Sequence, residues 1–133
     1  MKAFLQAFAL PGVQLYSLQK GTLERDLKSL SKDAPIIGLA PLIEDFADSA
    51  AAIAQLDLVI MTDTAIAHLC GALGKPVWLL LSYGSFWLWL LDRPDSPWYP
   101  SMQLFRQHAW GDCGSAFDAA AAELLRWSLA AER

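Results

Sequence analysis

The segment best suited to chemistry is a polar turn between an apolar run at residues 58–61 and a helix expected over residues 64–73. Asp63 and Thr64 form this turn. The first amides of a helix have no partner within the helix, and the helix dipole favours negative charge there. We therefore expect the Thr64 hydroxyl and the amides of Thr64 and Ala65 to bind a phosphate. The same pair is also typical of a helix N-cap without a ligand, so both interpretations stand.

A second polar pair follows the apolar run at residues 13–18, which we expect to be a strand. Lys20 carries the charge to neutralise a phosphate, and Gln19 can hydrogen-bond a nucleotide or a sugar. The two side chains are also typical of a solvated loop.

Two carboxylates and a histidine have a binding and a structural interpretation each. Asp45 and Asp48 lie just before the helix expected over residues 49–55. They can accept hydrogen bonds from ribose or sugar hydroxyls, although either of them can also be the cap of that helix. His68 lies one helical turn after Thr64, so it can contact a phosphate or sugar oxygen, or pack beneath the helix start as a structural residue.

Residues 82–100 form a long loop rich in aromatic side chains. These rings can stack on a sugar or base, or they can seal a core or a domain interface. We expect Arg93 and Ser96 to be the polar contacts of this loop. Because a small domain seldom leaves a large apolar patch bare to water, the aromatic loop at residues 83–89 also predicts a homodimer. The aromatic residues are Tyr83, Phe86, Trp87, Trp89, Trp98 and Tyr99.

Five apolar runs alternate with helical patterns and predict the fold. Strands are expected at residues 13–18, 36–39, 58–61, 76–81 and 102–105, and helices at residues 22–30, 49–55, 64–73 and 117–131. Runs that are apolar throughout and alternate with helices are typical of a parallel sheet covered on both faces. We therefore expect a Rossmann-like three-layer α/β/α sandwich with a parallel sheet of about five strands.

In such sheets, ligands bind outside the carboxyl ends of the strands. The loops that follow four of the expected strands should therefore converge on one crevice. They lie at residues 19–21, 40–48, 62–64 and 82–89.

The composition is that of one globular domain. The chain has 133 residues, and we expect a single domain over residues 1–133, with residues 1–12 as the remnant of an interdomain linker or helix. Hydrophobic residues make up 55% and charged residues 18%, which excludes a disordered chain. The net charge is -4 and no cluster of Lys and Arg occurs, which argues against a nucleic-acid partner.

The cysteines and the longest apolar run bear on location. Cys70 and Cys113 have neither a CxxC spacing nor His-rich surroundings, so we expect reduced thiols in a cytoplasmic protein, with no metal and no cofactor. The apolar run at residues 76–91 is about sixteen residues long, short of the roughly twenty that cross a bilayer. No membrane span is therefore expected.

Four segments, in order, resemble the heptosyltransferase-like glycosyltransferases of family 9, including versions linked to tetratricopeptide repeats. Residues 63–77 are similar to the pattern D-T-G/A-x-x-H-L-x-x-A-L-G-x-P-V, matching at Asp63, Thr64, Ala65, His68, Leu69, Ala72, Leu73, Gly74, Pro76 and Val77. Residues 15–21 resemble V-S-L-Q-K-G, and residues 45–50 resemble D-F-x-D-T-A. Residues 96–100 and 104–107 resemble the blocks S-P-W-Y-P and L-F-R-Q.

The resemblance implies the C-terminal half of a GT-B enzyme, which is the half that binds a nucleotide-diphosphate sugar. Asp63 would orient the sugar, and Thr64 with the amides of Thr64 and Ala65 would hold the leaving diphosphate. An acceptor domain or a tetratricopeptide-repeat domain would precede it, and the acceptor domain would supply the general base. We expect the chain alone to bind a donor without transferring its sugar.

One departure from the family supports a second function. Where family members read roughly P-F-x-P-D-W-R-W, Leu88 stands at the Arg position and Ser85 stands near the Asp. The alternative is therefore a degenerate or truncated glycosyltransferase-like domain that acts as an interaction module. A flavodoxin-like nucleotide or receiver domain fits less well, because no acidic pocket follows the first strand and no glycine-rich phosphate loop occurs.

Overall fold

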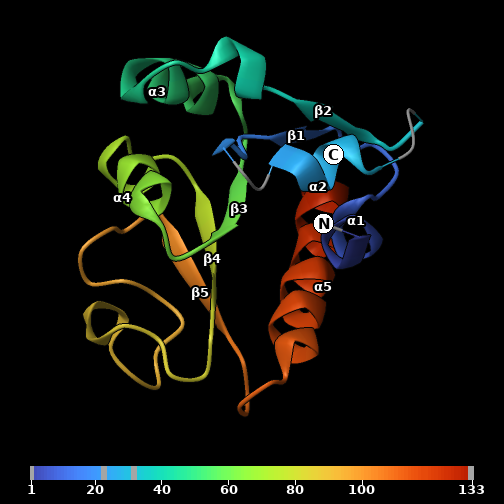
Figure 1. Ribbon diagram of the computed structural model, residues 1–133. Coiled ribbons are helices and arrows are strands. Elements are labelled where there is room, and N and C mark those ends of the chain that lie inside the picture. The colour runs from blue at the N-terminus through green and yellow to red at the C-terminus, as the bar shows by residue number, and fades with distance from the viewer. Residues whose placement is uncertain (1, 22–23, 31–32, 132–133) are drawn as a thin grey trace. The chain divides into compact units, whose positions relative to one another are not determined.

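The computed structural model describes residues 2–21, 24–30 and 33–131, and it is a mixed α/β structure (Figure 1). Its internal contacts divide the chain into two compact units, a first unit of Met1–Ser49 with Ala121–Arg133 and a second unit of Ala50–Ala120. The elements in chain order are α1 (Lys2–Phe8), β1 (Leu15–Ser17), α2 (Glu24–Lys28), β2 (Ile36–Gly38), the 3-10 helix η2 (Ala40–Leu42), α3 (Phe46–Gln55), β3 (Val59–Thr62), α4 (Ala65–Ala72), β4 (Val77–Leu81), the 3-10 helix η3 (Trp87–Trp89), β5 (Met102–Arg106) and α5 (Cys113–Ala131).

The strands form two parallel sheets. In the first unit β1 pairs with β2, and in the second unit the order is β3-β4-β5, with Val77 opposite Val59 on one side and Met102 on the other. The prediction of an α/β chain with parallel strands is confirmed, but the structure does not show the single sheet of about five strands. β1 and β2 are three residues long and offer few backbone groups, and within the described ranges neither pairs with the other strands.

β4 is the centre of the second unit. All five of its residues are buried, because it lies between two strands and both of its faces are covered. A strand in this position needs apolar side chains on both faces, and this explains why the sequence Val-Trp-Leu-Leu-Leu does not alternate. Buried residues of α4 and of the start of α5 complete the core, namely Ala67, Cys70, Ala116 and Ala120.

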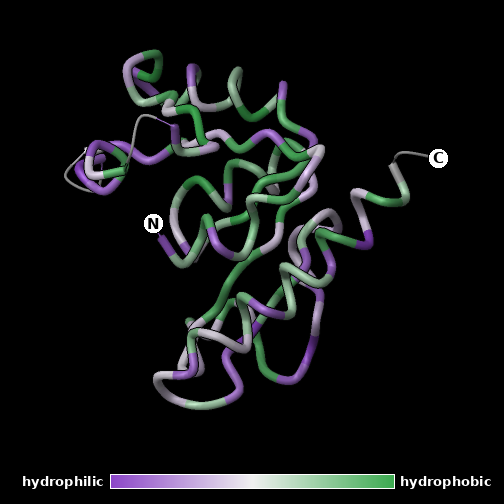
Figure 2. The backbone as a smooth tube through the Cα atoms, turned by 90° about the vertical axis from the view of Figure 1, so that its right-hand side faces the viewer, coloured by the Kyte–Doolittle hydropathy of each residue, from purple (hydrophilic) through white to green (hydrophobic). Residues whose placement is uncertain are grey.

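Capping residues explain where two helices begin and end. α4 stops at Ala72, and Gly74 follows with a φ of +66°, the left-handed conformation that glycine adopts readily at a helix end. α5 begins before the predicted residue 117, because the Asp112 carboxylate accepts a hydrogen bond from the Ser115 amide at 3.1 Å. Along α5, short hydrophobic and hydrophilic stretches alternate, as expected for an amphipathic helix (Figure 2).

The first unit is built around short elements. α1 buries Phe8, whose ring lies 4.6 Å from that of Phe4 between centroids. The carbonyl of Ser17 at the end of β1 accepts the amide of Leu39 at 2.9 Å, which extends the link between β1 and β2. The described part of the helix predicted over residues 22–30 is α2, while residues 22 and 23, where that helix was expected to start, lie outside the described residues.

The cysteines are both free thiols, and their surroundings differ. Cys70 is buried in α4, and burial raises the pKa of its thiol to about 11, so it stays protonated at neutral pH. Cys113 is exposed. In the part of the chain that is described, no helix has both the length and the apolar character to cross a membrane.

We predict that Gly71→Ala destabilises the second unit although it improves helix propensity. A Cβ at this position would lie 2.4 Å from Cγ of Tyr99, so the Tyr99 ring would have to move. Overpacking of this kind costs about 1–3 kcal/mol in the free energy of unfolding, measured by urea denaturation. Gly114→Ala in α5 is the matched control, because the nearest atom to its Cβ is 3.8 Å away, and it should be neutral or stabilising by up to about 1 kcal/mol. Equal effects of the two substitutions would contradict the tight contact.

Candidate functional site

A hollow of about 390 Å³ lies in the second unit, where β3, β4 and β5 end and α5 begins. The loops at residues 62–64 and 82–89 therefore meet at the carboxyl ends of the strands, as predicted for these two. The residues that line the hollow are Thr62, Asp63, Leu80, Leu81, Ser82, Gly84, Ser85, Phe86, Gln107, Cys113, Ala116 and Phe117.

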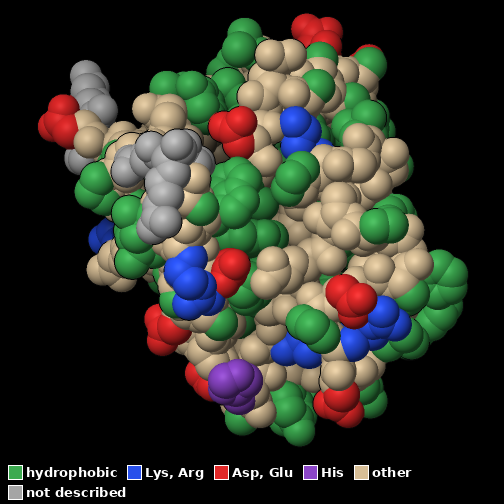
Figure 3. Space-filling model, turned by 180° about the vertical axis from the view of Figure 1, so that it is seen from behind, with side chains coloured by type: hydrophobic (Ala, Val, Ile, Leu, Met, Phe, Trp, Pro, Cys, Tyr) green, Lys and Arg blue, Asp and Glu red, His purple; other side chains and the backbone are tan. Residues whose placement is uncertain are grey.

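The lining of the hollow combines an apolar majority with a few polar groups. It contains one carboxylate, Asp63, and neither Lys nor Arg. Gln107 uses both ends of its side chain within the protein, since its oxygen accepts the Tyr83 amide at 3.3 Å and its nitrogen donates to Sγ of Cys113 at 3.2 Å. On the face seen in Figure 3, Lys and Arg side chains lie among Asp and Glu, and they form no basic cluster.

Asp63 is held in place by the long loop after β4. Its Oδ2 accepts a hydrogen bond from Nε1 of Trp89 at 2.8 Å. Trp89 is 0% exposed, so the indole N–H has no access to water and needs this partner. The carboxylate of Asp63 is therefore fixed at the wall of the hollow, with its other oxygen in none of the hydrogen bonds found among the described residues.

Thr64 begins α4 without using its side chain as a cap. Its backbone is extended, with a φ of -147°, and no side-chain capping hydrogen bond forms. The first helical bond joins the Ala67 amide to the Thr64 carbonyl at 2.9 Å, which leaves the amides of Ala65 and Ile66 ahead of the helical ladder. Thr64 and Ala65 are exposed, and neither is among the residues that line the hollow.

His68 is engaged inside the protein. Its ring stacks on that of Trp89, with 5.3 Å between centroids, and its Nδ1 lies 3.0 Å from the Tyr99 hydroxyl. This favours the structural interpretation of His68 over contact with a phosphate or sugar. The stack joins α4 to the middle of the loop at residues 82–100, and the contact with Tyr99 joins it to the end of that loop.

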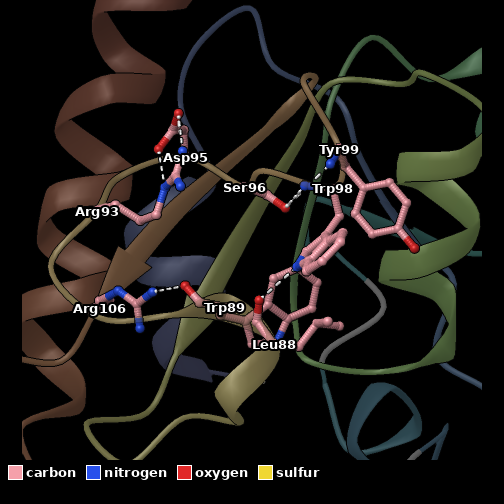
Figure 4. A network of polar contacts seen from close by, with 8 residues as sticks. All are labelled: Leu88, Trp89, Arg93, Asp95, Ser96, Trp98, Tyr99 and Arg106. Carbon is pink, nitrogen blue, oxygen red and sulfur yellow. Dashed lines mark hydrogen bonds and ion pairs between the residues drawn. The ribbon is translucent and has the colours of Figure 1, made fainter.

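Arg93 and Ser96 shape this loop (Figure 4). Both oxygens of Asp95 accept hydrogen bonds from the Arg93 guanidinium, at 2.7 and 3.0 Å, and this pairing lowers the pKa of Asp95. Ser96 is buried, and its Oγ accepts the amides of Trp98 and Tyr99. The polar groups predicted to contact a ligand are thus used in internal turns.

The backbone near Trp89 adopts unusual conformations for its residue types. Leu90 and Asp92 have φ values of 54° and 56°, in the left-handed region that favours glycine. The Trp98 indole donates to the Leu88 carbonyl at 2.9 Å, and this bond holds the two arms of the loop together (Figure 4).

Arg106 is a polar residue of this site that sequence reasoning missed. Its guanidinium donates to Oγ of Ser85 at 2.9 Å and to the Trp89 carbonyl, while its Nε is buried without a partner. Burial lowers the pKa of Arg106 from its usual value, although the charge of Asp92 opposes this shift. The only signal in the sequence is its place in the block L-F-R-Q, to which no role was attached.

Four other predicted site residues belong to the first unit. Nζ of Lys20 donates to the Ala40 carbonyl at 3.4 Å, and the Gln19 amide donates to Oγ of Ser17 at 3.2 Å. Asp45 caps α3, since its Oδ1 accepts the amides two and three residues later at 2.8 and 3.0 Å. Asp48 accepts the Glu44 amide at 2.8 Å. Of the two carboxylates expected as caps, Asp45 caps α3, whereas Asp48 lies in the first turn of the helix and bonds back to an amide that precedes it.

The comparisons with known proteins are sparse. No family model matches the chain, and no solved structure matches it. The chain is 32% identical over 105 residues to Protein FlbA of Caulobacter vibrioides. This match covers 76% of the chain and 17% of FlbA. The chain thus spans less than a fifth of that relative.

We predict that Trp89→Phe lowers the free energy of unfolding by about 1.5–3 kcal/mol, the range for hydrogen bonds to charged groups. The phenyl ring keeps most of the buried apolar area but cannot donate to Asp63. Trp87→Phe is the control, because Trp87 is 68% exposed and should change stability by less than about 0.5 kcal/mol. Urea denaturation followed by far-UV circular dichroism measures both.

A double-mutant cycle isolates the hydrogen bond from the loss of volume. Asp63→Ala and Trp89→Phe should show a coupling energy of at least about 0.5 kcal/mol, since the residues are in direct contact. Additive effects would mean that the bond does not stabilise the loop.

Proposed function

We propose that this chain is the donor-binding part of a GT-B glycosyltransferase and binds a nucleotide-diphosphate sugar. A Rossmann-like organisation and the resemblance to glycosyltransferase family 9 are parts of this proposal. The observation that carries it is that Thr64 starts α4 without a side-chain capping hydrogen bond, while the adjacent Asp63 lines a hollow at the strand ends.

Electrostatics favours a diphosphate at the start of α4. The free amides of Ala65 and Ile66 and the positive end of the helix dipole attract an anion, and the Thr64 hydroxyl adds a donor. When the sugar is transferred, negative charge builds up on the leaving diphosphate, and fixed donors stabilise that charge. The role of these groups is therefore to stabilise a leaving group.

The hollow suits the part of the donor that carries hydroxyl groups. Its volume of about 390 Å³ lies within the roughly 300–1,000 Å³ of small-molecule sites. Asp63 offers a carboxylate acceptor there for such hydroxyl groups.

Transfer of the sugar requires an acceptor domain, which is part of the proposal. We place the protein in the cytoplasm, which agrees with its two free thiols. The chain spans only 17% of FlbA, so the activity of a longer protein that contains it is also part of this proposal.

The alternative is an interaction module, and a specific surface favours it. Phe86, Trp87, Leu91 and Trp98 are exposed, and the rings of Phe86 and Trp87 lie 5.4 Å apart. Trp89 was expected in this surface, but it is buried because its indole bonds Asp63 and stacks on His68. The large hydrophobic side chains of this loop that are exposed are Tyr83, Phe86, Trp87, Leu90, Leu91 and Trp98. We call them the aromatic patch and propose that they form the contact of a homodimer.

The binding proposal predicts that Thr64→Val weakens the binding of a nucleotide-diphosphate sugar by about 1–2 kcal/mol, because one hydrogen bond to a charged group is lost. Isothermal titration against ADP, UDP and GDP sugars measures this effect and identifies the base. Thr64→Ser retains the hydroxyl and should bind like the wild type. If valine and serine variants bind equally, Thr64 is outside the site. Sugar transfer by the purified chain would contradict the need for an acceptor domain.

The dimer proposal predicts a concentration-dependent mass in sedimentation experiments. Trp87→Ser removes an exposed ring from the aromatic patch and should weaken association at least about tenfold, or 1.4 kcal/mol, without unfolding the chain. Leu42→Ser is the control, since Leu42 is 73% exposed and lies outside the patch. A strictly monomeric wild type at high micromolar concentration would rule the dimer out.

A further inference from the structure

Among the described residues, no carboxylate neutralises the positive charge of Arg106 by direct contact. The ion pairs found among the described residues are Lys28–Glu24, Arg93–Asp95 and Arg126–Glu123, and Arg106 takes part in none of them. Its two hydrogen bonds go to neutral oxygens, the Ser85 hydroxyl and the Trp89 carbonyl. Asp92 acts on it through space alone.

Arg93, in the loop at residues 82–100, differs from Arg106 at the end of β5, as Figure 4 shows. Arg93 is paired through two hydrogen bonds with Asp95. Arg106 points its guanidinium at a backbone carbonyl, and its Nε is buried with no acceptor. Removing a cation from water without a counter-ion costs free energy, and a guanidinium is best satisfied by two oxygens of one anion.

The position of Arg106 connects it to the hollow. Ser85, which accepts its hydrogen bond, is a lining residue, and so is the next residue in the chain, Gln107. The lining itself contains no cation. The Ser85 hydroxyl is therefore the group through which the guanidinium meets the hollow.

We propose that Arg106 is a diphosphate-binding residue of this hollow, and that the Ser85 hydroxyl occupies the place of a phosphate oxygen in the ligand-free chain. This inference rests on the proposed function, since it assigns a residue to the diphosphate of the donor. A diphosphate gives Arg106 the anionic oxygens it lacks. Asp63, on the same hollow, repels phosphate and attracts hydroxyl groups, which fits a ligand that carries both.

The test uses inorganic pyrophosphate as the probe, titrated at constant ionic strength into the full chain and three variants. Ser85→Asp gives Arg106 an internal carboxylate, so pyrophosphate binding should weaken at least tenfold while the melting temperature rises. Ser85→Ala removes the competing acceptor, so binding should be unchanged or tighter. Ser82→Asp is the matched control, because Ser82 lines the hollow without a hydrogen bond to Arg106, and its effect should be threefold or less.

Each outcome supports or overturns the role of Arg106. Equal weakening by Ser82→Asp and Ser85→Asp would mean simple charge repulsion and would overturn it. So would a Ser85→Asp variant that is more stable yet binds like the wild type. If Thr64→Val weakens pyrophosphate binding in that case, the diphosphate binds at the start of α4 and Arg106 is not part of its site. No pyrophosphate binding by the wild type at millimolar concentration would reject this role, whereas titration with nucleotide sugars decides the proposed function separately.

Discussion

The hydrogen bond between the Trp89 indole and Asp63 is the contact on which the site of the second unit depends. It joins a loop of about twenty residues to the turn that begins α4. The His68 ring stacks on the same indole and reaches Tyr99 at the far end of the loop. This buried donor and its acceptor fix the Asp63 carboxylate and the middle of the loop.

The same loop distributes the charges of the site unequally. It neutralises Arg93 within its own turn, and it leaves Arg106 bonded to neutral oxygens behind Ser85. At the end of the neighbouring edge strand β3, the Thr64 hydroxyl at the start of α4 makes no capping hydrogen bond. The free donors of Thr64 and Arg106 lie beside the hollow, and the fixed carboxylate of Asp63 lines it. This combination suits a ligand that carries both anionic and hydroxyl groups.

The sequence predicts well what depends on local pattern. β4 is apolar at every residue because both its faces are covered, and α4 is expected almost to the residue because its turn and its glycine mark both ends. The meeting of Trp89 with Asp63 was not predicted, because it depends on the path of a loop across 26 residues. The sequence left Asp45 as either a cap or a ligand contact, because a carboxylate before a helix looks alike in both roles, and the structure shows the cap.

The two left-handed residues, Leu90 and Asp92, show where the shape of the loop comes from. Each adopts a backbone conformation that costs a residue with a side chain about 1 kcal/mol or more, and neither is a glycine that would adopt it freely. At these two residues the backbone is therefore held by contacts with the rest of the fold and not by their own conformational preference. Excised as a peptide, residues 82–100 would relax to right-handed and extended conformations, and the aromatic side chains would lose their arrangement.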